Sequence, residues 1–153
     1  MLDDLFVPTP VAGATTNQIA NAAFVAAAFS SAGVPLPTLA WSAYTPTLTA
    51  GLGSLTSLGT TTGRYAQIGK TVFCAIDVSI ATNGTGSSFL NVGLPVVPFD
   101  TAAFSGREVN VTFKTLSVLS RGAIPTAVIR YYDATYPGVD GGRYILGGSY
   151  EVP

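Results

Sequence analysis

The chain has 153 residues, of which 48% are hydrophobic and only 10% are charged. Eight acidic and seven basic side chains give a net charge of −1, and there is no histidine and a single cysteine. Low basicity argues against a nucleic-acid partner, because neutralising phosphates requires a face rich in lysine and arginine. The lack of histidine excludes Ser-His-Asp and Cys-His catalysis, and it leaves too few ligands for a zinc site.

The length suits one domain with a short appendage. Low charge favours a chain that buries surface in an oligomer, although a monomer with a Ser/Thr-rich surface has the same composition. The first residues, MLDDLFVPTP, carry acids where a signal peptide needs positive charge. No apolar run approaches the ~20 residues of a membrane span. We therefore expect synthesis in the cytoplasm, with no export signal in the chain and no membrane insertion.

Residues 15–30 carry the clearest helix signal. Thr15 and Gln18 fit a capping box, and the alanine-rich sequence that follows is the best helix former. A band at helical spacing provides the candidate oligomerisation residues: Ile19, Ala22, Ala23, Ala26 and Phe29, with Val25 beside them. This band is suited either to a three-helix junction with two other copies or to packing against the chain's own β-domain.

Proline-containing segments flank this helix. Residues 1–14 are predicted to form an extended arm, and residues 31–40 a stiff linker. We therefore divide the chain into residues 1–40, which attach and trimerise, and a separate domain of residues 41–153.

Residues 71–81 alternate between apolar and mixed side chains, the period of a half-buried strand. Cys74 lies on the apolar face and is expected to be a small buried hydrophobe. Gly69-Lys70 before this strand and Asn83-Gly84 after it are turn signals.

The remaining strands are shorter. They are predicted at residues 44–49, 64–68, 89–92, 109–113, 116–119, 126–132 and 143–152, with residues 98–106 as a connection and residues 50–63 holding one short strand and a loop. About eight short strands with regular turns favour an all-β, antiparallel β-sandwich of jelly-roll type.

Several short motifs lie along residues 41–153 and are considered as a set. They are W-x-x-Y-T-P-T-L-T from Trp41 to Thr49, G-R-Y-x-x-I-G-K-x-V from Gly63 to Val72, T-N-G-T-G from Thr82 to Gly86, Leu94-Pro95, and the closing G-x-Y-E-V from Gly148 to Val152. The set resembles the distal module of tailed-bacteriophage fibre and spike proteins. The segment from Thr16 to Val25 is also similar to one that recurs in phage tail fibres. The resemblance implies the β-sandwich tip of a homotrimer that binds a host receptor or decorates the virion.

Carboxylate chemistry is the catalytic route that the composition leaves. A glycosidase needs two acids facing each other across a cleft, and Asp133 and Asp140 share a loop. Acidic residues in glycine-rich turns usually stabilise the turn through hydrogen bonds to the backbone. The sequence also has no regular Asp-x-Asp spacing of the kind that binds calcium. We predict no enzyme activity, no metal site and no cofactor.

The loop YYDATYPGVDGGR, residues 131–143, is the most distinctive polar-aromatic segment. Tyrosine rings stack on sugars and their hydroxyls form hydrogen bonds. The candidate receptor-binding residues are Tyr132, Asp133, Tyr136, Asp140 and Arg143. Alternatively the loop is structural, because one of two adjacent tyrosines must point inward in a half-buried strand.

These patterns lead to one functional expectation and two alternatives. We expect a fibre or spike component of a bacteriophage-like virion, assembled in the host cytoplasm, that contacts other virion proteins through its N-terminal segment and adheres to a host-surface glycan. The chain has no long shaft, so a short spike or a decoration protein without receptor binding is one alternative. A monomeric cellular carbohydrate-binding module is the other.

Overall fold

The computed structural model describes residues 40–153, so the predictions for the arm, the helix and residues 31–39 of the linker lie outside it. Within the described residues there are nine strands and no helix: β1 (Ser42–Tyr44), β2 (Leu48–Leu52), β3 (Ser57–Ile68), β4 (Thr71–Thr82), β5 (Ser87–Gly93), β6 (Ala103–Glu108), β7 (Thr115–Arg121), β8 (Ile124–Tyr131) and β9 (Arg143–Glu151). Every strand pairing is antiparallel. The all-β, antiparallel expectation is confirmed.

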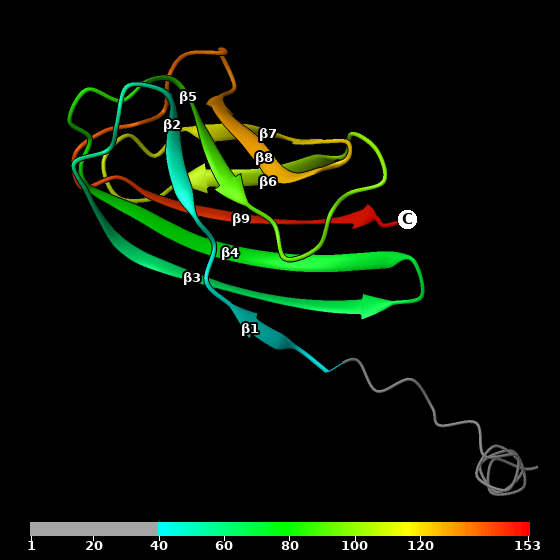
Figure 1. The fold of residues 1–153 in the computed structure, drawn as a ribbon. Coiled ribbons are helices and arrows are strands. Elements are labelled where there is room, and N and C mark those ends of the chain that lie inside the picture. The colour runs from blue at the N-terminus through cyan, green and yellow to red at the C-terminus, as the bar shows by residue number, and fades with distance from the viewer. Residues whose placement is uncertain (1–39) are drawn as a thin grey trace, which may run out of the picture. The chain divides into compact units, whose positions relative to one another are not determined.

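The strands form one continuous sheet in the order β1-β3-β4-β9-β6-β7-β8-β5-β2, where the sequence predicted the two sheets of a sandwich. Strands β1 and β2 are neighbours in sequence but occupy opposite edges, so the sheet must curl to bring its edges together. The Tyr44 hydroxyl of β1 lies 3.4 Å from the Gly93 carbonyl oxygen of β5 across this gap. Figure 1 shows the two halves of the curled sheet facing each other.

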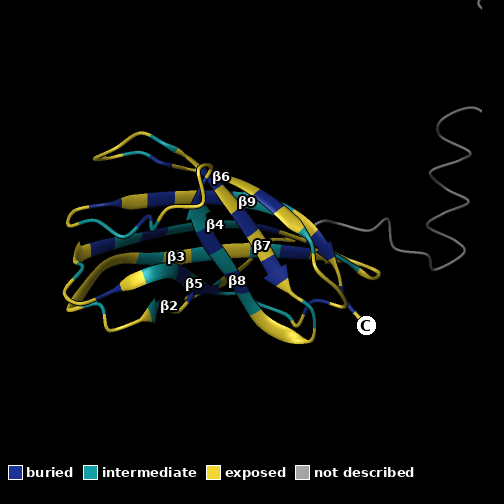
Figure 2. Cartoon of the chain, turned by 90° about the horizontal axis from the view of Figure 1, so that it is seen from above, coloured by how far each residue is buried: buried dark blue, intermediate teal, exposed yellow. Residues whose placement is uncertain are grey.

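The core fills the inside of the curl. Strands β4, β7, β8 and β9 bury alternate residues over most of their length, and Figure 2 shows this alternation as changing colours along β7 and β8. On β4 the apolar face expected from the sequence is buried, including Cys74, which is 4% exposed. Burial raises the pKa of the Cys74 thiol to about 11, so the group stays protonated at neutral pH. On β9 the buried set includes Tyr144, Leu146 and Tyr150, as the alternation predicted.

The strand predicted at residues 44–49 is two strands. Strand β1 ends at Tyr44 and β2 begins at Leu48, and the residues between them cross from one edge of the sheet to the other. Pro46 lies in this crossing, where its missing N–H removes no ladder hydrogen bond.

Two predictions around residue 108 are wrong. The expected connection at residues 98–106 contains most of β6, and the expected strand at residues 109–113 is a loop. The alternation of Val109, Val111 and Phe113 suggested a strand. The Val109 N–H does donate to the Arg143 carbonyl of β9, but the backbone N–H groups of residues 110–113 bond a side chain instead of a neighbouring strand.

Candidate functional site

Four loops gather at one end of the sheet, and we call this the loop end. Residues 53–56 bond residues 82–85, Asn83 bonds Asp140, and Asn110 bonds Gly141. The opposite end holds the β3–β4 hairpin and the C-terminus, where the Val152 N–H donates to the Lys70 carbonyl. Figure 1 shows the chain entering β1 near the C-terminal end, away from most of these loops. The loop end therefore lies at the end of the sheet opposite the β3–β4 hairpin and the C-terminus.

A buried carboxylate organises one of these loops. Glu108 at the end of β6 is 0% exposed. Its oxygens accept hydrogen bonds from the backbone N–H groups of all four residues 110–113, from the Thr112 hydroxyl and from the N–H of Arg143. These bonds fix the path of residues 110–113, while backbone bonds from Val109 to Arg143 and from Glu108 to Lys114 hold the two ends of the loop.

The Glu108 carboxyl is ionised in the fold. Burial opposes ionisation, but the N–H donors of Thr112, Asn110, Arg143 and Val111 outweigh it and lower the pKa of Glu108 to about 2. A buried charge that is fully hydrogen-bonded is the form that a protein interior tolerates.

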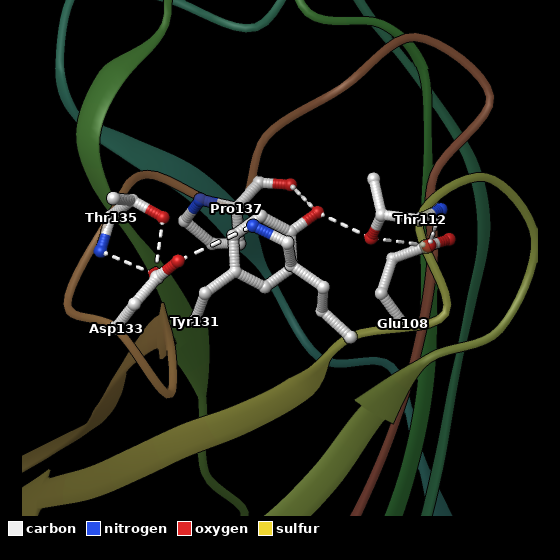
Figure 3. A network of polar contacts seen from close by, with 7 residues as sticks. Glu108, Thr112, Tyr131, Asp133, Thr135 and Pro137 are labelled. Carbon is white, nitrogen blue, oxygen red and sulfur yellow. Dashed lines mark hydrogen bonds and ion pairs between the residues drawn. The ribbon is translucent and has the colours of Figure 1, made fainter.

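The same network joins the 109–114 loop to the 132–142 loop, as Figure 3 shows. The Thr112 hydroxyl lies 2.8 Å from the Tyr131 hydroxyl, and the Tyr131 hydroxyl lies 3.3 Å from the carbonyl oxygen of Pro137. The Tyr144 hydroxyl donates to the same carbonyl at 2.8 Å. The loop at 132–142 is thus fixed to the loop at 109–114 through buried side chains.

The rigid 109–114 loop exposes two apolar side chains. Val111 is 43% exposed and Phe113 is 56% exposed. Phe113 has φ of 56°, in the left-handed region that a bulky residue rarely adopts. Such a conformation costs on the order of 1–3 kcal/mol and persists only where the surroundings impose it. Here Glu108 imposes it by holding the N–H of Phe113.

Tyr132 and Asp133, two of the candidate receptor-binding residues, lie next to this loop. Tyr132 is 69% exposed while its neighbour Tyr131 is 5% exposed, so the inward residue of the pair is Tyr131. The N–H of Tyr132 donates to the carbonyl of Thr115, which places it beside the start of β7. Asp133 pairs with Lys114 at 3.3 Å, and a hydrogen bond from the Thr135 hydroxyl is the main cause that lowers the pKa of Asp133.

Tyr136 and Asp140 are also in the loop, but each bonds Asn83 in the β4–β5 turn. The Tyr136 hydroxyl donates to the Asn83 side-chain oxygen at 2.6 Å, and Asp140 accepts the Asn83 N–H at 2.6 Å. Tyr136 is partly buried against the core. These two predicted site residues hold the loop end together.

Arg143 points away from the other four candidates. It begins β9 on the outer face of the sheet, where its guanidinium makes two bonds to Asp77 of β4 at 2.9 and 2.6 Å. The structure therefore exposes Tyr132 at the loop end, and it gives Asp133, Tyr136, Asp140 and Arg143 intramolecular partners.

Sequence reasoning missed Glu108, Phe113 and Lys114. The available signal was the single acid at the start of the run EVNVTF, residues 108–113, which has no other charged residue. The positive φ of Phe113 has no sequence signal, because glycine or asparagine usually marks that conformation.

Two further findings bear on the class of protein. Among residues 40–153 there is no group of three or more cysteine, aspartate or glutamate side chains that could hold a metal ion. The same part of the chain contains no helix long and apolar enough to cross a bilayer.

Comparison with protein-family models, with curated proteins and with solved structures finds no match to this chain in any of the three. The likeness to phage fibre and spike proteins is therefore a hypothesis that rests on the motifs in the sequence.

Proposed function

We propose that this protein is a non-enzymatic adhesion component of a bacteriophage-like particle, and that its loop end binds a saccharide on the host surface. The observation that carries the proposal is the strained, exposed Phe113, held in place by the buried Glu108 carboxylate. Backbone strain concentrates at functional sites. A strained backbone that presents an exposed aromatic ring therefore favours a role in recognition.

The chemistry of the loop end suits a sugar. Phe113 and Tyr132 offer aromatic rings that stack on the apolar faces of a sugar, and the Lys114–Asp133 pair offers both a donor and an acceptor for its hydroxyls. The loops are already fixed by the Glu108 network, so binding costs little ordering entropy.

The particle assignment comes from the sequence motifs and from the arrangement of the domain. We interpret the curled sheet as a jelly-roll-like tip, with residues 1–40 attaching it to other virion proteins and forming a homotrimer. Three weak sites on one trimer raise the effective affinity by orders of magnitude. The loop end lies opposite the end at which the chain enters β1, which suits a tip (Figure 1).

We expect Phe113→Gly and Tyr132→Ala each to weaken saccharide binding by about tenfold or more, since each removes an exposed ring from the loop end. Phe113→Gly also relieves the backbone strain, so its thermal midpoint should equal or exceed that of the wild type. The measurement is retention of the labelled full-length protein on an array of bacterial surface saccharides.

Phe99→Ala is the matched control, because Phe99 is 62% exposed but bonds Glu151 near the C-terminus. It should bind as the wild type does. Loop-end variants that bind as tightly as the wild type would contradict the assigned site. A wild-type protein that binds no saccharide while Asp133→Asn or Asp140→Asn abolishes a hydrolytic turnover would favour an enzyme instead.

The full-length chain is expected to be a trimer in solution, and removal of residues 1–35 should give a monomer. Light scattering measures both masses. A full-length monomer at micromolar concentration would contradict the self-trimerising fibre and would favour a monomeric carbohydrate-binding module.

A further inference from the structure

The outer face of the sheet carries a shallow groove, which lies away from the core. One hollow of about 300 Å³ lies over β3, β4 and β9, and a second of about 490 Å³ lies over β9 and β6. Ile145 and Leu146 border both hollows, so together they form one groove that crosses four strands. At ~4.8 Å between strands, its floor is about 14 Å long.

The strand register places the lining side chains in rows. Ala75 pairs with Gly147, and Gly147 pairs with Ser105, which gives the groove a floor of small residues. Asp77 and Arg107 both pair with Ile145, and these three form one wall.

The charge on this face is opposite to that of the whole chain. Arg64 and Arg107 line the hollows, and Arg143 lies on the same face of β9. The acid that lines the hollows is Asp77, which forms an ion pair with Arg143. With Glu151, which also lies on the outer face of β9, three cations and two anions lie on this face, in a protein of net charge −1. The Arg64 guanidinium lies 5.0 Å from the Trp41 ring, and Trp41 is 46% exposed. Such a surface attracts an anionic ligand and offers it an aromatic ring.

Gly147 keeps the centre of the groove open. A Cβ added there would meet only the Cys74 carbonyl oxygen, at 3.7 Å, so no protein atom occupies the space above it. Glycine within a strand weakens the strand, and it often marks a place where a ligand approaches the backbone.

We propose that this groove is a second binding site, separate from the loop end, and that it takes an acidic saccharide chain lying across β3, β4, β9 and β6. Carboxylate or phosphate groups of the saccharide would accept hydrogen bonds from Arg64 and from the terminal nitrogens of Arg107, whose Nε donates to the Phe113 carbonyl. Planar guanidinium groups favour such anions. The backbone over Gly147 would pack against a sugar ring. Such a site would let the domain hold a charged surface polymer along its side while the loop end binds its own sugar.

The test compares binding of the full-length protein to immobilised oligogalacturonate, to a phosphorylated oligosaccharide and to neutral galactose oligomers. We expect at least one acidic probe to bind, and its binding to weaken as salt increases. Arg64→Ala and Arg107→Ala should each weaken this binding about fivefold or more, and Gly147→Leu should abolish it by filling the groove. The two acidic probes distinguish carboxylate from phosphate recognition.

Lys70→Ala is the charge control, because Lys70 is an exposed cation of the β3–β4 hairpin. It should leave binding unchanged, and the thermal midpoint of Gly147→Leu should match that of the wild type. Acidic binding that Tyr132→Ala removes and Gly147→Leu leaves intact would overturn the groove site while the loop-end proposal stands. Binding of neutral sugars alone would do the same, and binding of no saccharide would overturn both. Loss of the trimer in Gly147→Leu, without acidic binding in the wild type, would assign the face to a second copy of the chain.

Discussion

Glu108→Ala is expected to lower the free energy of unfolding by about 3–5 kcal/mol, the largest effect of any single substitution that we predict. The change leaves the N–H groups of residues 110–113 and of Arg143 without their acceptor at a buried position. Each unsatisfied buried donor costs roughly 1–3 kcal/mol, and partial access of water to the exposed loop lowers the total. Urea unfolding measures the loss as a shift in midpoint at unchanged slope.

Glu151→Ala is the control, because Glu151 is an exposed acid at the end of β9. Its effect should stay within about 0.5 kcal/mol. If Glu108→Ala does not fold, Glu108→Gln provides the second variant, since its amide oxygen can still accept some of these bonds. A Glu108→Ala protein as stable as the Glu151→Ala protein would contradict the structural role of this carboxylate.

The pH dependence of stability gives an independent reading of the same group. The fold lowers the pKa of Glu108 from 4.5 to about 2, so the unfolded chain binds this proton at higher pH than the native protein does. The stabilisation is therefore fully present above about pH 4.5 and is lost as the pH falls through about 2. It amounts to roughly 3 kcal/mol at neutral pH, at 1.36 kcal/mol per pKa unit. The gap between wild-type and Glu108→Gln urea midpoints should narrow over this range, and a constant gap would contradict the assignment.

The adjacent pair Gly147 and Gly148 should respond oppositely to the same substitution. A Cβ at Gly148 would lie 2.6 Å from the Phe104 ring inside the curl, whereas one at Gly147 would make only an ordinary contact, with the Cys74 carbonyl oxygen at 3.7 Å. We expect Gly148→Ala to destabilise by about 2 kcal/mol through overpacking. Gly147→Ala should be neutral or stabilising by up to about 1 kcal/mol, because alanine has less backbone entropy to lose.

Each glycine serves as the other's control in thermal or urea unfolding. Equal effects at the two positions would show that the inward and outward faces of β9 are not assigned correctly. The comparison therefore also tests the register on which the groove depends.

The strands with a clean alternation could be predicted from the sequence. In β4 and β9 the side-chain period is a local property of an extended chain, so the buried faces, with Cys74 and Tyr144, followed directly. The loop at 109–114 could not be predicted in this way. Val109, Val111 and Phe113 have the same period, but the carboxylate of Glu108 competes successfully for the N–H groups that a strand would pair.

The candidate site residues also differ in how far the sequence could predict their surroundings. Tyr132 and Asp133 could be selected as exposed from composition and from the Tyr-Tyr pair. The hydrogen bonds of Tyr136 and Asp140 to Asn83 join residues more than 50 positions apart in the sequence. No local pattern encodes such a contact, because it arises only when the sheet curls and brings the loops to one end.

The sequence by itself determined the β class, the inward face of the regular strands and the lack of histidine-based chemistry. Those properties follow from side-chain type and from a period of two residues. The tertiary structure decided that the strands form one sheet, that Pro46 lies where the chain changes edges, and that Glu108 is buried. It also decided that Gly147 faces outward between arginines of other strands. These features depend on the register between distant strands, which is set when the whole core packs.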